Sequence, residues 1–290
     1  IKLNDLLKTK TIRGLLSLRQ SICSWASGPD EDKPVVVLVQ GETNYESLKP
    51  YIDALSEHFS VLVIESIRSH FEYLFLDADI DEVTEMYYTH LDMRLSLAGL
   101  QVAAFTGHCL GGDLAYRLAC RWRDDNPDCY APVCLLDSFW VDNDRPVQKV
   151  DAGRIPEELV RFYENQTDII DNQMNMYTSL GFHGAPVPYD GKLSMFRAMK
   201  TTHLLAAVAA AIGITEEEAA SRFGVDDDFL MKAWQPQRAV DNEQIWRSYR
   251  PDIECFHVDS DHMGILGSEY VGEYVEWLMA NTAGNSKNLF

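Results

Sequence analysis

Residues 107–112 of this 290-residue chain, Gly-His-Cys-Leu-Gly-Gly, place a cysteine where it could act as a nucleophile. An apolar run typical of a buried strand, residues 100–107, precedes Cys109, and a run with helical spacing, residues 111–125, follows it. A strand-to-helix turn of this kind holds the nucleophile in a strained conformation above a sheet, and the flanking glycines allow close approach. The helix N-terminus also favours a thiolate. We therefore predict that Cys109 is catalytic rather than a small buried residue.

A nucleophilic thiol needs a base, which in a site of this type lies late in the chain. His262 follows a predicted strand at residues 252–258 and is the expected base. His257 lies inside that strand, so we expect it to be packed in the core. His108 adjoins the nucleophile and is not expected to reach its sulfur productively.

The acid that orients the base should follow one of the strands after the turn. The predicted strand at residues 131–139 contains Leu-Leu-Asp137-Ser, whereas no carboxylate follows the predicted strand at residues 191–198. This contrast selects Asp137. Asp259 and Asp261 are sequence neighbours of His262 and are poorly placed to orient its ring.

The remaining requirement is an oxyanion hole made of backbone N–H groups. One donor is expected to be the N–H of Leu110, the residue after the nucleophile. The other should come from the loop after the predicted strand at residues 35–40. In that loop Gly41, Glu42 and Thr43 are the candidates, and Gly41 would permit close backbone approach.

The elements that must position these residues alternate between strand and helix. The predicted strands are residues 35–40, 59–66, 100–107, 131–139, 191–198 and 252–258, and the predicted helices are 44–58, 80–98, 111–125 and 268–280. This alternation predicts an α/β protein with a mostly parallel central sheet and helices on both faces. Further helical patterns predict a lid insertion with segments at about 145–190 and 203–235.

Composition excludes several classes of function. The formal net charge of −20 argues against binding to nucleic acid or to an anionic membrane surface. No apolar run is long enough to span a membrane. The six cysteines lack the spacing of a zinc site or a disulfide scaffold, which favours a reducing, cytoplasmic location. The glycines do not form a dinucleotide-binding pattern, and we expect no cofactor and no metal.

Three segments together resemble a known family: GHCLGGDLAYRLA around Cys109, LLDSFW around Asp137, and DHMGIL around His262. They are similar to the type I thioesterase domains of nonribosomal peptide and polyketide synthetases, whose usual motif has serine in place of Cys109. The resemblance covers residues 35–280. It implies an α/β-hydrolase fold over residues 35–285, a Cys109–His262–Asp137 triad, and an acyl or peptidyl thioester substrate.

The first residues strengthen the resemblance. Residues 1–19 resemble the last part of a carrier (thiolation) domain, and residues 20–34 are expected to be a linker. The resemblance therefore implies an upstream carrier domain as partner, which delivers the substrate on a phosphopantetheine arm.

Cysteine in place of serine changes the expected chemistry. An acyl-cysteine is a thioester, close in energy to the incoming carrier thioester, so it keeps more activation for the second step. Thioesterase-like domains with a cysteine nucleophile resemble the domains that close β-lactone or β-lactam rings. We therefore expect release by intramolecular cyclisation, with hydrolysis as the competing outcome. An engineered replacement of serine by cysteine at position 109, made to trap an acyl-enzyme, would give the same sequence as a natural cysteine.

Two other interpretations remain open. A stand-alone cysteine hydrolase resembling dienelactone hydrolase would share the G-x-C-x-G-G motif, but it would be shorter and would carry its acid after the later strand. An inactive α/β-hydrolase-fold module could serve as a binding partner, because fold alone does not define function.

Overall fold

The structure is a computed structural model. It describes residues 22–41, 43–66, 80–138, 188–200, 204–234 and 242–282. The predicted carrier remnant at residues 1–19 lies outside the described residues, as does most of the first predicted lid segment.

Seven strands form one sheet in the order β1-β3-β2-β4-β5-β6-β7. β1 pairs antiparallel with β3, and every other neighbouring pair is parallel. The strands are β1 (Cys23–Trp25), β2 (Val35–Val39), β3 (Ser60–Ile64), β4 (Val102–His108), β5 (Val133–Leu136), β6 (Leu193–Ala198) and β7 (Glu254–Val258). The prediction of a mostly parallel sheet is confirmed.

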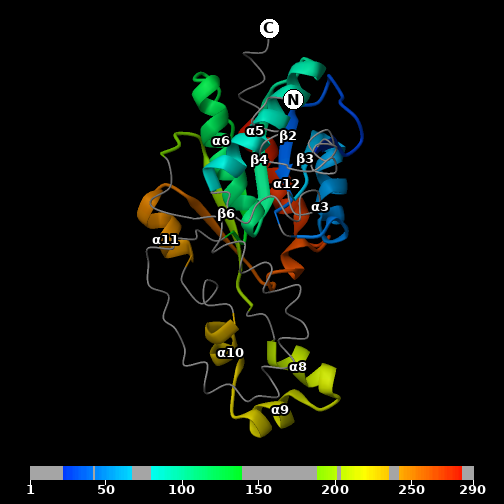
Figure 1. Ribbon diagram of the computed structural model, residues 1–290, viewed down its shortest axis with the longest axis vertical. Coiled ribbons are helices and arrows are strands. Elements are labelled where there is room, and N and C mark those ends of the chain that lie inside the picture. The colour runs from blue at the N-terminus through cyan, green and yellow to red at the C-terminus, as the bar shows by residue number, and fades with distance from the viewer. Residues whose placement is uncertain are drawn as a thin grey trace, which may run out of the picture.

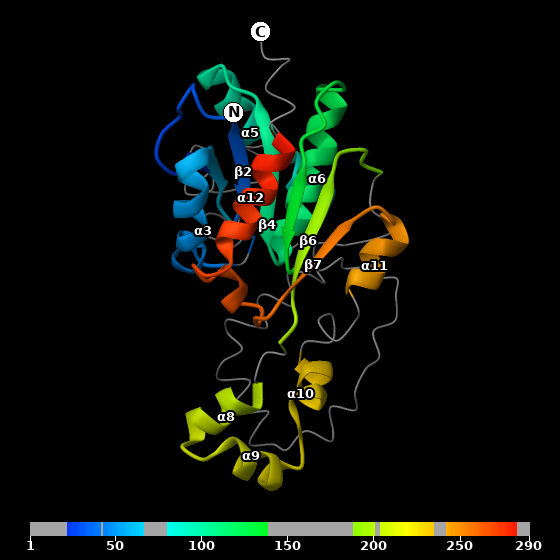
Figure 2. The ribbon, with the colours of Figure 1, turned by 180° about the vertical axis from the view of Figure 1, so that it is seen from behind.

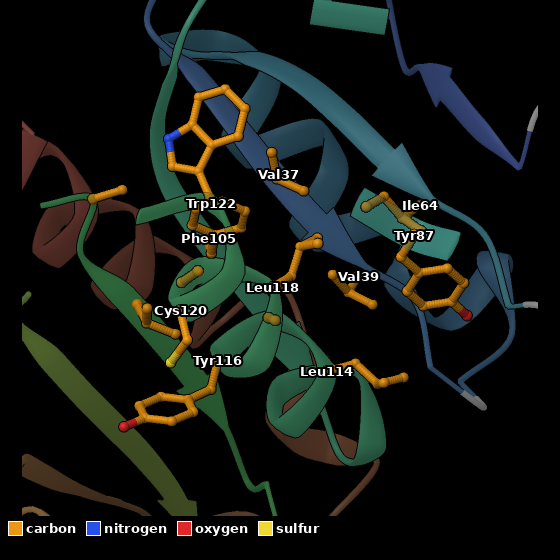
Figure 3. Close-up of a cluster of buried hydrophobic side chains, with 14 of the residues drawn as sticks. Val37, Val39, Ile64, Tyr87, Phe105, Leu114, Tyr116, Leu118, Cys120 and Trp122 are labelled. Atoms are coloured by element: carbon orange, nitrogen blue, oxygen red, sulfur yellow. The ribbon is translucent and has the colours of Figure 1, made fainter. Parts of the chain in front are cut away.

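Helices cover both faces of the sheet (Figures 1 and 2). The helices α5 (Ile80–Ala98) and α6 (Leu110–Asp125) pack on one face, and α3 (Tyr45–His58) and α12 (Val271–Thr282) pack on the other. Successive side chains of a strand point to opposite faces. Accordingly, Val37 and Val39 join the α5/α6 cluster drawn in Figure 3, whereas Val36 and Leu38 join the α3/α12 cluster. Burial on both faces explains the unbroken apolar run of β2.

Among the strands and α-helices of the described residues, two were not predicted. Residues 23–25, which we expected to belong to a linker at 20–34, form β1 and pair with β3 from Cys23↔Ile64 to Trp25↔Leu62. A helix, α11 (Asn242–Tyr249), precedes β7. β1 is three residues long and carries no pattern of its own, because its extended form depends on pairing with β3, about forty residues further along the chain.

The second predicted lid segment contains three short helices: α8 (Leu204–Ile212), α9 (Glu216–Phe223) and α10 (Asp227–Trp234). They follow β6 and lie beyond the carboxyl ends of the strands (Figures 1 and 2). Their buried side chains form a separate small core that includes Val208, Ala219 and Leu230. None of the helices in the described ranges is long and apolar enough to cross a membrane.

Candidate active site

Cys109 lies at the sharp turn between β4 and α6. Its φ of 57° and ψ of −127° are uncommon for a residue with a side chain, because the Cβ crowds the backbone there. Hydrogen bonds hold the strained turn: Cys109 N donates to Leu136 O of β5 at 3.0 Å, and Gly112 N donates to Cys109 O at 3.1 Å. The side chain of Cys109 does not cap α6. The predicted strand–cysteine–helix geometry is therefore present.

The glycines around Cys109 are required by close backbone packing. A Cβ on Gly107 would collide with the backbone carbonyl of Gly111, and a Cβ on Gly111 would collide with Val39 O of β2. A Cβ on Gly112 would overlap the Ser138 hydroxyl. The first turn of α6 thus rests directly on the ends of β2 and β4, as the motif predicts.

Asp137 and His262 are in direct contact, although 125 residues separate them: Oδ2 of Asp137 lies 2.6 Å from Nδ1 of His262. Asp137 follows β5 with a φ of 43°. Its N–H donates to Phe196 O of β6 at 2.8 Å, and its Oδ1 accepts from Ala198 N at 3.1 Å. A carboxylate at Nδ1 favours the tautomer with the proton on that nitrogen, which leaves Nε2 of His262 able to accept a proton.

The turn that carries His262 is held by its preceding residue. Oδ1 of Asp261 accepts from Met263 N at 3.1 Å and from Gly264 N at 2.6 Å, which is the pattern of an aspartate-capped turn. Asp259 pairs at the surface with Lys200 at 3.2 Å. Asp261 thus holds the backbone of the turn and Asp259 forms a surface ion pair, whereas Asp137 contacts the His262 ring.

His108 has contacts that the sequence does not indicate. Its side chain is buried, with Nδ1 at 2.7 Å from Thr43 Oγ1 and Nε2 at 2.8 Å from the backbone O of His262. Its ring lies against that of His262, with centroids 4.3 Å apart. The partners are 65 and 154 residues away in the chain, so no local pattern could have revealed them.

The expectation for His257 was wrong. This residue lies in β7, as predicted, but its side chain is 52% exposed and its Nε2 lies 2.8 Å from Glu243 of α11. β7 lies at one edge of the sheet, and four of its five residues are not buried. The hydrogen bond with His257 lowers the pKa of Glu243 to about 2 against the opposing effect of desolvation. His257 therefore makes a surface contact with Glu243 rather than packing in the core.

The predicted oxyanion donors lie in part within the described residues. Leu110 is the first residue of α6, where an N–H has no acceptor inside the helix. Gly41 has a φ of 60° and packs on the backbone of Leu110 and Gly111, so a side chain there would collide with α6. Glu42 lies outside the described residues. The Thr43 hydroxyl contacts His108.

A buried carboxyl group lies one turn along α6 from the cysteine. Asp113 is fully buried, and desolvation raises its pKa to about 6, although Arg117 at 3.2 Å acts in the opposite direction.

None of the six cysteines, all of which lie in the described ranges, forms a disulfide bond. Within the described ranges, no group of three or more histidine, cysteine, aspartate or glutamate side chains could hold a metal ion.

The sheet order, the cysteine turn after β4, the aspartate after β5 and the histidine after β7 together define an α/β-hydrolase fold. Solved structures agree with this class. The type II thioesterase YbtT of the yersiniabactin nonribosomal peptide/polyketide pathway matches with a TM-score of 0.55 and 8% identity, covering 91% of this chain and 98% of that one.

Two further structures extend the comparison. The NocB thioesterase domain, solved as a covalent complex with a fluorophosphonate nocardicin G analogue, matches with a TM-score of 0.50 and 16% identity, covering 86% of this chain and 94% of that one. The four-domain nonribosomal peptide synthetase AB3403, bound to AMP and glycine, matches with a TM-score of 0.57 and 12% identity, covering 97% of this chain but 22% of that one. No protein-family model and no curated protein matches the sequence. The predicted α/β-hydrolase fold is confirmed.

Proposed function

We propose that this protein is a chain-releasing thioesterase with Cys109 as its nucleophile. The observation that carries the proposal is the Asp137–His262 contact of 2.6 Å, together with the strained turn that presents Cys109 on the adjacent strand. A largely buried pair of this kind, beside a cysteine at a helix N-terminus, has the chemistry of an activated thiol.

In the first step, Nε2 of His262 takes the thiol proton of Cys109, and the sulfur attacks the carbonyl carbon of the incoming thioester. Asp137 accepts from Nδ1–H and stabilises the imidazolium that forms. The N–H groups of Leu110 and of Gly41 or Glu42 bind the developing oxyanion. The tetrahedral intermediate then collapses, the carrier thiol leaves with the proton from His262, and the acyl group remains on Cys109.

In the second step, His262 deprotonates an acceptor that attacks the acyl-cysteine, and the Cys109 thiol is released. Because the acyl-cysteine is itself a thioester, its activation is retained for this step. We propose a nucleophile on the substrate as acceptor, which closes a ring such as a β-lactone or β-lactam, with water as the competitor. No cofactor takes part.

The substrate arrives on the phosphopantetheine of an upstream carrier domain in the cytoplasm. The resemblance of residues 1–19 to such a domain supports this partner, and the likeness of the fold to one part of a multidomain synthetase is consistent with it. The helices α8–α10 stand beyond the carboxyl ends of the strands, where ligands bind in open α/β sheets. We propose that they form part of the lid over the substrate chamber.

The test uses short acyl thioesters of pantetheine and records the intact mass of the protein over time. We expect a transient adduct of one acyl group that is lost in Cys109→Ala and retained in Cys129→Ala, a matched change at a half-buried thiol outside the site. Analysis of the released product then separates a ring from the free acid.

Acylation that persists in Cys109→Ala would contradict the assignment of the nucleophile. A free acid as the product from every substrate with an internal nucleophile would refute cyclisation and leave hydrolysis. A Cys109→Ser variant is informative in the same assay, because its ester adduct should form and decay more slowly than the thioester.

A further inference from the structure

His108, the residue before the proposed nucleophile, joins two loops that are distant in the chain. Its side chain is fully buried, with 0% exposed. Nδ1 contacts Thr43 Oγ1 at 2.7 Å, on the loop after β2 that we assign to the oxyanion hole. Nε2 contacts the backbone O of His262 at 2.8 Å, on the loop after β7. One imidazole at the end of β4 therefore contacts both sides of the proposed site.

These contacts define the proton positions on the ring. A backbone carbonyl only accepts, so Nε2 of His108 must carry the hydrogen of its bond to His262. In the neutral imidazole, Nδ1 is then an acceptor, and it accepts a hydrogen bond from the hydroxyl group of Thr43. Thr43 is itself held, because the Gln40 side chain donates to Thr43 O at 2.8 Å. Each ring nitrogen of His108 thus has a suitable hydrogen-bond partner, and both bonds form with the ring in one orientation.

The bridge supplies restraints on His262 that Asp137 alone does not. The Asp137 contact holds one edge of the ring at Nδ1 and leaves the ring able to tilt about that bond. The His108 bond holds the backbone at residue 262. The His108 ring, at a centroid distance of 4.3 Å and an interplanar angle of 37°, lies against one face of the His262 ring and limits its tilt.

We propose that His108 is a positioning residue, which keeps His262 in register with Cys109 through the Thr43–His108–His262 bridge. The inference rests on the proposed function, since it concerns the base of that reaction. Displacing a reacting group by about 1 Å costs up to about a hundredfold in rate, so loss of the bridge should be measurable even if Asp137 stays in place.

Three substitutions separate the two contacts of the ring. Glutamine places its amide nitrogen near the position of Nε2, so His108→Gln can still donate to the carbonyl of His262. Asparagine has polar atoms only near the position of Nδ1, so His108→Asn can reach Thr43 but not His262. Thr43→Val removes the hydroxyl and preserves the ring.

The measurement is the rate at which iodoacetamide alkylates Cys109 across a range of pH, followed by peptide mass, with the half-buried Cys129 as reference. The sulfur of the thiolate displaces iodide, so the rate reports how well His262 activates the thiol without any substrate. We expect Cys109 of the wild type to react faster than Cys129 at neutral pH. His108→Asn should slow it by about tenfold or more, with the rates converging at alkaline pH, and His108→Gln should recover most of the loss.

The downfield proton resonance of the His262 Nδ1–H···Asp137 bond provides a second readout. We expect it to broaden or vanish in His108→Asn and to remain in His108→Gln. Equal alkylation profiles for the wild type and His108→Asn would overturn the positioning role while leaving the nucleophile in place. An equal loss in the Asn and Gln variants would also overturn it, because it would assign the effect to core packing. If Cys109 of the wild type reacts no faster than Cys129, the proposed function fails and the inference fails with it.

Discussion

The central sheet and the α8–α10 group are built in different ways. In the sheet, β2 and β3 are buried along their whole length, and glycines bring the first turn of α6 onto the strand ends without intervening side chains. The α8–α10 group buries a few side chains around Leu230 in a core of its own, and α9 buries only Ala219. An acidic cavity of about 670 Å³ lies on this group, lined by Leu205, Glu216, Glu217, Ala220 and Asp226 to Asp228.

The comparison shows where the molecule can hold a precise geometry. Cys109 and Asp137 are the two non-glycine residues with positive φ among the described ranges, and the backbone N–H of each donates to a carbonyl of the neighbouring strand. Strain of this kind persists only where the surroundings over-determine the conformation. The α8–α10 group lacks such constraints, so its proposed role is to enclose the substrate rather than to perform chemistry on it.

The sharpest test of this division compares two carboxylates. Asp137→Asn should lower the rate of acyl transfer by up to about 10⁴-fold, because an amide at this position favours the wrong tautomer of His262. Glu217→Gln, an exposed change on α9 at the acidic cavity, should leave the rate constant nearly unchanged. Single-turnover acylation measured by intact mass gives both values.

If Glu217→Gln lowers the acylation rate constant as much as Asp137→Asn does, the proposed division between the two regions is wrong and α9 takes part in the chemistry. If Glu217→Gln changes only the apparent affinity for the substrate, the acidic surface contacts the substrate without taking part in bond making, which supports the division.

Much of the sheet could be predicted because its strands are continuous apolar runs, and a strand buried on both faces needs no partner to be recognised. The elements that escaped prediction depend on contacts distant in the chain. β1 is extended only because it pairs with β3, and α11 is short and contributes Ile245 and Trp246 to the core.

The site divides along the same line. Asp137 was selected because the neighbouring strand end lacks a carboxylate, and the structure places it against His262. His257 was misassigned because alternation within a strand does not reveal that the strand lies at an edge. The contacts of His108 could not be predicted, because Thr43 and the backbone of His262 lie on two loops that meet at the end of β4 only in the folded chain.

A second test compares two glycines. Gly111→Ala drives a Cβ into Val39 O, where backbone on both sides prevents relief, and we expect a loss of more than about 3 kcal/mol in the free energy of unfolding. Gly213→Ala, in the turn after α8, has a φ of +73° but open space around the added Cβ. It should cost about 1 kcal/mol, the strain of a left-handed residue.

Urea unfolding followed by tryptophan fluorescence checks both variants. If Gly111→Ala unfolds at the midpoint of the wild type, the close contact between α6 and β2 is wrong. If the Gly213→Ala midpoint falls as far as that of Gly111→Ala, the turn after α8 is as constrained as the cysteine turn, and the two regions do not differ in the way described.

The last comparison uses one N-terminal helix cap in each of the two regions, and its expected effects are small. Asn44 accepts from Ser47 N at 2.8 Å at the start of α3, and Thr215 forms a reciprocal capping box with Glu218 at the start of α9. Replacing either cap with alanine should cost about 1 kcal/mol.

For Asn44→Ala the cost should appear in the global unfolding midpoint, because α3 buries four side chains and packs on the sheet. For Thr215→Ala it should appear as faster hydrogen exchange within residues 216–223, because α9 can open without exposing the main core. An equal fall in the global midpoint of both variants would mean that the α8–α10 group unfolds only together with the sheet.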